Sequence, residues 1–242
     1  MLSKYLKKES LPTPWCPGCG NGSILRAVCS AFSDLQFKKD NVVVVSGIGC
    51  AGRSAGFFDL DSIHAAHGRS VPVAEGIKMV NDALNVVVLS GDGDLLGIGG
   101  NHLIHASRRN TNITVVCFSN EIYGLTGGQA APTTPTGTKT LTSPDGYNEI
   151  TMDIQPLLKS HNCFYAKSTV YHYKHLEQCL TAALKYDGFS FVDIKVQCIT
   201  NNGRRLGFNN ATEMLQQFKE NYMINERPAS LEPEELGITK CS

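Results

Sequence analysis

The sequence lacks several features that would place it in a simple functional class. Lys and Arg number 22, and Asp and Glu also number 22, so no charge of one sign is in excess. Surfaces that bind nucleic acid or anionic membranes usually show such an excess, and we expect neither partner. Apolar runs such as 42–45 are far shorter than the roughly 20 residues of a membrane span. The charged N-terminus has no apolar signal core, so a cytoplasmic protein is expected.

Repeats and low-complexity linkers are also missing from the 242 residues. A chain of this length buries roughly 70–75% of its unfolded surface, which is enough for a core without disulfide staples. We expect one domain over 1–242, with an N-terminal arm at 1–20 and a C-terminal tail at 203–242. The nine cysteines are an odd number without a disulfide framework, and they favour ligation of a metal or cluster.

Continuous apolar segments alternate with helical patterns along the chain. Strands are expected at 42–46, 85–90, 112–119, 163–167 and 189–197, and helices at 21–32, 72–84, 99–109, 151–160, 173–186 and 212–221. This alternation is typical of an α/β fold, a mainly parallel sheet with helices on both faces. Ligands bind such sheets at the carboxyl ends of the strands. Three successive strands end in GIGC, GDGD and SNEIYG, which predicts a polar site at that edge.

Asp92 and Asn120 are the first candidate ligand pair. One helix and one strand separate them, so their side chains are expected to meet at neighbouring strand ends. A carboxylate, an amide oxygen and a backbone carbonyl are hard oxygen ligands that suit Mg²⁺. The glycines beside Asp92 let backbone N–H groups approach a diphosphate. Two ordinary Gly-rich turns are the alternative for GDG alone, and the spacing to Asn120 favours the metal–diphosphate site.

The cysteines form a second candidate site. Cys16 and Cys19 are a CxxC pair in a Gly-rich loop, a pattern that also suits zinc or a redox disulfide. Cys50 ends the first core strand and Cys198 follows the last, so four thiolates from three segments can hold either zinc or a [4Fe–4S] cluster. Ligands at strand ends beside the candidate cofactor loop favour the cluster. The remaining cysteines are interpreted as buried apolar residues or, for Cys241, as part of the tail.

GDG followed at a βαβ spacing by Asn is the thiamine diphosphate motif. The strings 91-GDGDLLGIGGNHLIHASRRN-110 and 120-NEIYGLTGGQAAPTTPTG-137 resemble the β subunit of 2-oxoacid:ferredoxin oxidoreductases, and the similarity extends over about 15–201. The 2-oxoglutarate-type branch is the most similar. The resemblance implies a thiamine diphosphate-binding fold and the CoA-dependent oxidative decarboxylation of a 2-oxoacid, with 2-oxoglutarate favoured and ferredoxin as electron acceptor.

The resemblance also assigns residues. Mg²⁺ would be held by Asp92, Asn120 and the carbonyl of Ile122. A proximal [4Fe–4S] cluster would be held by Cys16, Cys19, Cys50 and Cys198. The implied cofactor-binding set further contains Ile48, Gly49, Cys50, His67, Gly68, Gly91, Gly93, Asp94, Gly124, Leu125 and Thr126. Members of the family often have Asn at 119 and Pro at 197, where this chain has Ser119 and Gln197.

Basic side chains near these motifs have two interpretations each. By the family match His67 donates to a diphosphate oxygen, and the alternative is an ordinary loop histidine. Arg53 and Arg69 have the two-pronged geometry that binds a substrate carboxylate, or they form ion pairs at a subunit contact. His102 and His105 lie one turn apart and are interpreted as a packed helix face.

The resemblance implies partners as well. The thiamine-activating carboxylate and most of the 2-oxoacid and CoA site would lie on an α subunit, with small γ and ferredoxin-like δ subunits as further partners. Three alternatives stay open: a pyruvate- or branched-chain-specific member, a non-redox thiamine diphosphate decarboxylase or synthase subunit with zinc at the cysteines, and a zinc-stabilised nucleotide-binding scaffold.

Overall fold

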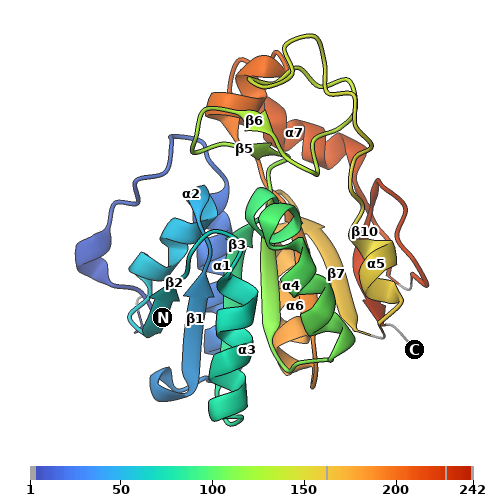
Figure 1. The fold of residues 1–242 in the computed structure, drawn as a ribbon. Helices are drawn as coiled ribbons and strands as arrows, with labels where there is room; N and C mark the ends of the chain where they lie inside the picture. The colour runs from blue at the N-terminus through green and yellow to red at the C-terminus, as the bar shows by residue number, and fades with distance from the viewer. Residues whose placement is uncertain (1–3, 162, 227, 241–242) are drawn as a thin grey trace.

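The computed structural model describes residues 4–161, 163–226 and 228–240, so Cys241 and the ends of the expected arm and tail lie outside the described residues. Its main strands are β1 Val42–Ser46, β2 Asp61–His64, β3 Asn85–Gly91, β4 Thr114–Ser119, β7 Phe164–Thr169, β8 Ser190–Lys195, β9 Met223–Ile224 and β10 Glu235–Lys240. They form one sheet in the order β2-β1-β3-β4-β8-β7-β10-β9 (Figure 1). The strands from β2 to β7 run parallel, and β10 runs antiparallel to β7. The sheet is therefore mainly parallel, as predicted.

Helices cover both faces of this sheet. The helices are α1 Asn21–Asp34, α2 Gly49–Gly52, α3 Ser70–Val80, α4 Gly100–Arg108, α5 Gln155–Lys159, α6 Tyr173–Lys185 and α7 Ala211–Asn221. Residues of α1 and α6 form one core cluster with the sheet, and residues of α3, α4 and α5 form another on the opposite face. Apolar runs in the central strands are buried on both sides, because neither face of the sheet meets water.

The order of the strands brings three polar turns together. β1, β3 and β4 are neighbours in the sheet, with Ser46 beside Leu89 and Gly91 beside Phe118. Their carboxyl ends therefore lie at one edge, below the loop that contains the hairpin β5 Ile122–Tyr123 and β6 Gln129–Ala130 (Figure 1). The sequence-based placement of GIGC, GDGD and SNEIYG at this edge is confirmed.

Several elements differ from the sequence-based expectation. Helix α5 begins at Gln155 rather than at 151, because the Asp153 carboxylate accepts from the Gln155 N–H (3.0 Å) and Pro156 follows in the first turn. The edge strand β2 is short and mostly exposed, so it has no apolar run to indicate it. The expected tail contains α7 and also β10, which extends the main sheet beside β7.

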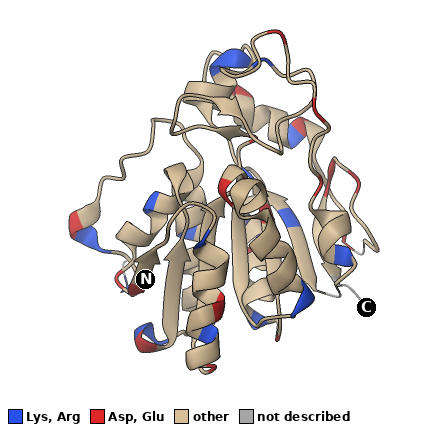
Figure 2. Cartoon of the chain, in the orientation of Figure 1, with Lys and Arg blue, Asp and Glu red and all other residues tan. Residues whose placement is uncertain are grey.

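The expected arm is tied to the domain. Tyr5 is fully buried, its hydroxyl donates to the Phe32 carbonyl at 3.1 Å, and Leu6 forms a β-bridge with Phe58. Figure 2 shows Lys and Arg mixed with Asp and Glu over loops and helix ends rather than gathered in one region. Among the described residues, no helix combines the length and the apolar character that crossing a bilayer requires.

Candidate active site

Asp92 lies directly after β3, at the start of a π-helical turn, Gly93–Ile98. Its side chain is 1% exposed, and its Oδ2 accepts from the Glu121 N–H at 2.8 Å and from the Thr133 hydroxyl. Burial raises the pKa of Asp92 to about 6, against the lowering effect of these two hydrogen bonds. Both donors are neutral, so neither balances the negative charge of this buried carboxylate. A cation would balance it, and Asp92 is therefore a candidate metal ligand. π-Helical turns of this kind occur often at functional sites.

Asn120 and Ile122 lie in the turn after β4. The Asn120 Oδ1 accepts from the Ile122 N–H at 3.1 Å, and Glu121 between them has φ +62°, a left-handed conformation that is uncommon for a residue with a side chain. Lys195, on the neighbouring strand β8, forms an ion pair with Glu121 at 2.8 Å. The turn that contains Asn120 and Ile122 therefore lies next to the Asp92 carboxylate.

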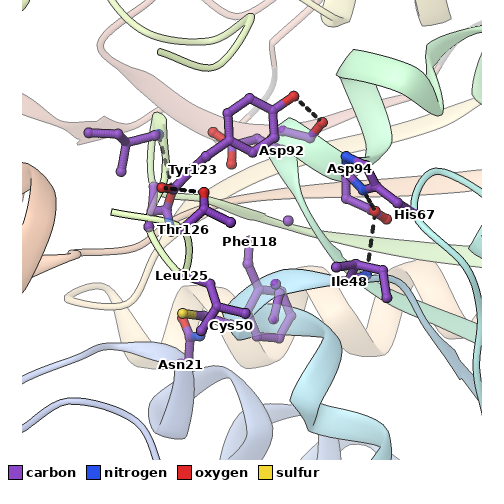
Figure 3. Close-up of a pocket in the computed structure, with 17 residues that line it drawn as sticks. Asn21, Ile48, Cys50, His67, Asp92, Asp94, Phe118, Tyr123, Leu125 and Thr126 are labelled. Atoms are coloured by element: carbon purple, nitrogen blue, oxygen red, sulfur yellow. Dashed lines mark hydrogen bonds and ion pairs between the residues drawn. The ribbon is translucent and has the colours of Figure 1, made fainter. Parts of the chain in front are cut away.

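The predicted ligands border one cavity of about 170 Å³ at the sheet edge (Figure 3). Of the predicted residues, its lining contains Ile48, Gly49, Cys50, His67, Gly91, Asp92, Gly93, Asp94, Asn120, Ile122, Gly124, Leu125 and Thr126. The predicted residue Gly68 is not part of this lining, and its N–H donates to Asp94, which is. The lining also contains four residues that sequence reasoning missed, Asn21, Ala51, Phe118 and Tyr123. The structure therefore brings the predicted set together.

Asp94 organises one side of this cavity. Its Oδ1 accepts from the backbone N–H of Gly68 at 2.9 Å and of Ile48 at 3.4 Å, and it contacts His67 Nδ1 (Figure 3). Its Oδ2 accepts from the Ser90 hydroxyl. A carboxylate engaged by these donors holds its neighbours in place, and its charge would repel a diphosphate at close range. Asp94 therefore positions the His67 ring beside the cavity.

Tyr123 supports the turn after Asp92. Its hydroxyl donates to the Gly93 carbonyl at 2.8 Å. A Cβ at Gly93 would lie 2.4 Å from the Tyr123 ring, and one at Gly97 would lie 2.5 Å from the Tyr123 hydroxyl. Gly93 is thus required by close packing as well as by any ligand. An aromatic residue in a Gly-rich loop shows no periodicity, so the sequence contained no signal for this contact.

The four predicted cluster ligands surround a second cavity, of about 160 Å³. Cys16, Cys19, Cys50 and Cys198 all line it, together with Trp15 and Arg53. Burial is the largest cause that raises the pKa of Cys19 to about 12, and the charges of the other three thiols act in the same direction against the lowering effect of a backbone hydrogen bond at Asn21. In the described part of the chain, no group of three or more His, Cys, Asp or Glu side chains is arranged to hold a metal ion. The four thiols therefore line one cavity, but they are not arranged around a single metal position.

The remaining described cysteines lie elsewhere. Cys29, Cys117, Cys163 and Cys179 are fully buried in the two cores, and none of the eight described cysteines forms a disulfide. The interpretation of these four as small apolar residues is therefore confirmed.

The two cavities share a wall. Asn21, Cys50, Asn120, Gly124 and Leu125 line both of them. A Cβ at Gly124 would lie 3.2 Å from the Cys198 Sγ, so the cofactor loop approaches the cysteine site closely because it has glycine there. The Trp15 indole N–H donates to the Cys50 carbonyl at 2.8 Å and holds the thiol segment from the other side.

Comparisons with known proteins agree with this arrangement. Residues 36–194 match the family model described as thiamine pyrophosphate enzyme, C-terminal TPP binding domain. The 2-oxoglutarate synthase subunit KorB of Methanothermobacter marburgensis is 41% identical over 234 residues, 96% of this chain and 82% of that protein. 2-Oxoacid:ferredoxin oxidoreductase 2, subunit beta, of Aeropyrum pernix is 44% identical over 190 residues, 78% of this chain and 61% of that protein. This chain belongs to the β subunits of 2-oxoacid:ferredoxin oxidoreductases.

A solved structure similar to this β subunit shares its fold. A chain of 2-oxoglutarate:ferredoxin oxidoreductase from Magnetococcus marinus, with 2-oxoglutarate, coenzyme A and succinyl-CoA bound, is 30% identical and has a TM-score of 0.88. The match covers 100% of this chain and 84% of that chain. The expected fold and family are confirmed. The TPP-binding match includes Asp92 and Asn120, whereas Cys16, Cys19 and Cys198 lie outside it, so the ligand assignments stay predictions.

Two of the basic residues lie near the site of this β subunit. Arg53 lines the cysteine cavity and an adjacent groove of about 410 Å³ that also contains His64 and Leu125. The Arg69 guanidinium donates to the Gly68 carbonyl at 3.4 Å. His102 and His105 lie on α4, outside the lining of both cavities.

Proposed function

We propose that this β subunit holds Mg²⁺ and thiamine diphosphate in the cavity at the ends of β3 and β4. Asp92, Asn120 and the carbonyl of Ile122 would hold the metal, while backbone N–H groups of the turn 91–94 and of the loop 124–126 would hold the diphosphate. The donor set supports this proposal, because one buried carboxylate and an amide oxygen face one cavity. The Gly-rich turn adds backbone N–H groups at the start of a helical segment, where anionic oxygens bind well.

The four cysteines would hold a [4Fe–4S] cluster. A mononuclear zinc site needs all its sulfur ligands at about 2.3 Å from one centre. A four-iron cluster takes each thiolate on a different iron, so the sulfur atoms surround a volume. Four thiols that line one cavity of about 160 Å³ support the cluster.

The complex would catalyse CoA-dependent oxidative decarboxylation of a 2-oxoacid. The 2-oxoacid and CoA give an acyl-CoA, CO₂ and a proton, and two electrons leave singly through the cluster to ferredoxin. Bound thiamine diphosphate supplies the electron sink at the keto carbon. The shared wall of the two cavities carries this proposal, because Cys50 and Gly124 border both sites and keep the electron path short.

An α subunit would complete the site. It would supply the carboxylate that activates thiamine and most of the 2-oxoacid and CoA contacts, which fits relatives that are named as subunits. Small γ and ferredoxin-like δ subunits would be further partners. The complex would act in the cytoplasm.

Metal analysis of the anaerobically purified complex tests the redox function. We expect about four irons and four acid-labile sulfides per β subunit, the content of a [4Fe–4S] cluster. Stoichiometric zinc without iron would overturn the redox function and support a non-redox thiamine diphosphate enzyme.

2-Oxoglutarate is the proposed substrate, since relatives at 41% identity are named 2-oxoglutarate synthase subunits. Arg53 in the groove beside Leu125 offers a two-pronged partner for the second carboxylate of this substrate. For Arg53→Ala we expect the KM for 2-oxoglutarate to rise about 10- to 100-fold, the usual cost of a hydrogen bond to a charged group. The KM for pyruvate, which has no second carboxylate, should stay the same.

The control for this substitution is Arg108→Ala, at an exposed position on α4. An equal rise in KM for both 2-oxoacids would show that Arg53 does not select 2-oxoglutarate.

A further inference from the structure

The segment 197–205 joins the cysteine site to the cofactor loop. It follows β8, contains Cys198, and forms a π-helical turn at Ile199–Gly203. On the cysteine side, the Gln197 side-chain amide donates to the Gly18 carbonyl at 3.1 Å, between Cys16 and Cys19. The Gly20 N–H also donates to the Gln197 carbonyl at 3.4 Å. The loop of the CxxC pair is therefore attached to the segment that contains Cys198.

On the cofactor side, three side chains of the same segment donate to backbone carbonyls of the loop 120–127. Asn202 donates to the Asn120 carbonyl at 2.9 Å, and Asn201 donates to the Gly124 carbonyl at 2.5 Å. Arg205 donates to the Gly127 carbonyl at 3.2 Å. The segment thus holds the turn with the predicted metal ligands and the loop predicted to bind diphosphate.

The peptide between Asn120 and Glu121 is the central contact. Asn202 holds its carbonyl oxygen, and its N–H donates to Asp92 Oδ2 at 2.8 Å. Glu121 has φ +62°, so this peptide needs support from its surroundings. Asn202 gives that support from a buried position, at 5% exposure.

Burial of these amides carries a cost. Among the described residues, neither the Gln197 Oε1 nor the Asn202 Oδ1 has a hydrogen-bond partner. A buried acceptor without a partner usually costs about 1–3 kcal/mol. Apolar side chains at 197 and 202 would avoid this cost, but they could not donate the two hydrogen bonds. The function of these two amides is therefore in their N–H groups.

We propose that Asn202 is a positioning residue for the metal-binding turn and that the segment 197–205 couples cluster occupancy to binding of magnesium–thiamine diphosphate. This inference rests on the proposed function. A cluster bound to Cys198 orders the segment, and the segment then holds the Asn120–Glu121 peptide beside Asp92. Coupling between two sites is reciprocal, so the bound cofactor stabilises the cluster by the same factor.

A binding cycle on the intact complex tests the coupling. The dissociation constant of thiamine diphosphate in saturating Mg²⁺ is measured with the cluster present and after its oxidative removal, with folding checked by circular dichroism. In the parent complex we expect removal of the cluster to weaken binding by about 5-fold or more, within the usual range of coupling between sites. In Asn202→Ala, we expect the iron content to be unchanged and thiamine diphosphate to bind more weakly. The ratio of its dissociation constant without the cluster to that with the cluster should fall toward one.

Two further variants complete the test. Asn202→Thr keeps nearly the same volume without the amide donor and should give the same reduced ratio if Asn202→Ala fails to fold. Asn221→Ala, at an exposed position on α7, should keep the parent ratio. A parent ratio near one, or an unchanged ratio in both Asn202 variants, would overturn the coupling while leaving the proposed function intact. A parent complex without iron or without thiamine diphosphate binding would overturn the proposed function and the coupling with it.

Discussion

The two halves of the site are assembled in different ways. The metal–diphosphate half comes from adjacent strand ends, with Asp92 after β3 and Asn120 after β4. The cysteine half comes from three distant segments: the loop before α1, the start of α2 and the segment 197–205 after β8. A pair of neighbouring βα units is enough to form the first half, whereas the second depends on the order of the whole sheet. Substitutions in the two halves should therefore differ in their main effect, which falls on cofactor binding in one half and on iron content in the other, and the proposed coupling adds only a smaller effect across the halves.

The largest expected effect is in the metal–diphosphate half. Replacing a residue that only supports a metal ligand usually lowers metal affinity by about 10- to 100-fold. Asp92→Ala removes a proposed ligand itself, so it should weaken Mg²⁺-dependent thiamine diphosphate binding by more than about 100-fold. Iron content should be unchanged. Calorimetry on the assembled complex measures the first effect, and iron analysis measures the second. Asp145→Ala, at an exposed loop position, is the control, and parent-like binding in Asp92→Ala would remove Asp92 from the site.

The second expected effect is in the cysteine half. Cys198→Ser should lower the iron content below about four per chain and abolish ferredoxin reduction, because serine is a poor substitute for a thiolate on iron. Cys179→Ser, in the core between α6 and the sheet, should keep the iron and is the matched control. Full iron content in Cys198→Ser would show that another residue is the fourth ligand.

The smallest expected effect concerns the packing beneath the metal–diphosphate half. Gly93→Ala places a Cβ against the Tyr123 ring, and overpacking of this kind costs about 1–3 kcal/mol of unfolding free energy. In a Tyr123→Leu background the same substitution should cost less, because the clash is removed. Chemical denaturation of the four proteins measures the difference. An equal cost in both backgrounds would mean that Tyr123 is not the reason for glycine at 93.

The sequence was most informative where function depends on residues close to strand ends. Asp92 and Asn120 were predicted as a pair, since apolar runs locate β3 and β4 and parallel strands end at one edge. Asn21 and Tyr123 were missed, because each reaches the cavity through packing rather than through a motif. The strand β10 was missed as well, since its pairing with β7 joins segments about seventy residues apart in the chain.

The sequence by itself determined the mainly parallel sheet, because apolar periodicity locates its strands and helices. It also determined the family, because the motifs in 91–110 and 120–137 resemble those of the family, and with the family it predicted the residue types of both sites. Only the tertiary structure decided that the four thiols surround a cavity and that this cavity shares a wall with the cavity lined by Asp92 and Asn120. It also decided that Asp94 is engaged by its neighbours and that Asn202 holds the peptide beside Asp92. These contacts join segments brought together by the order of the strands, and the hydrophobic burial that sets this order acts over the whole chain at once.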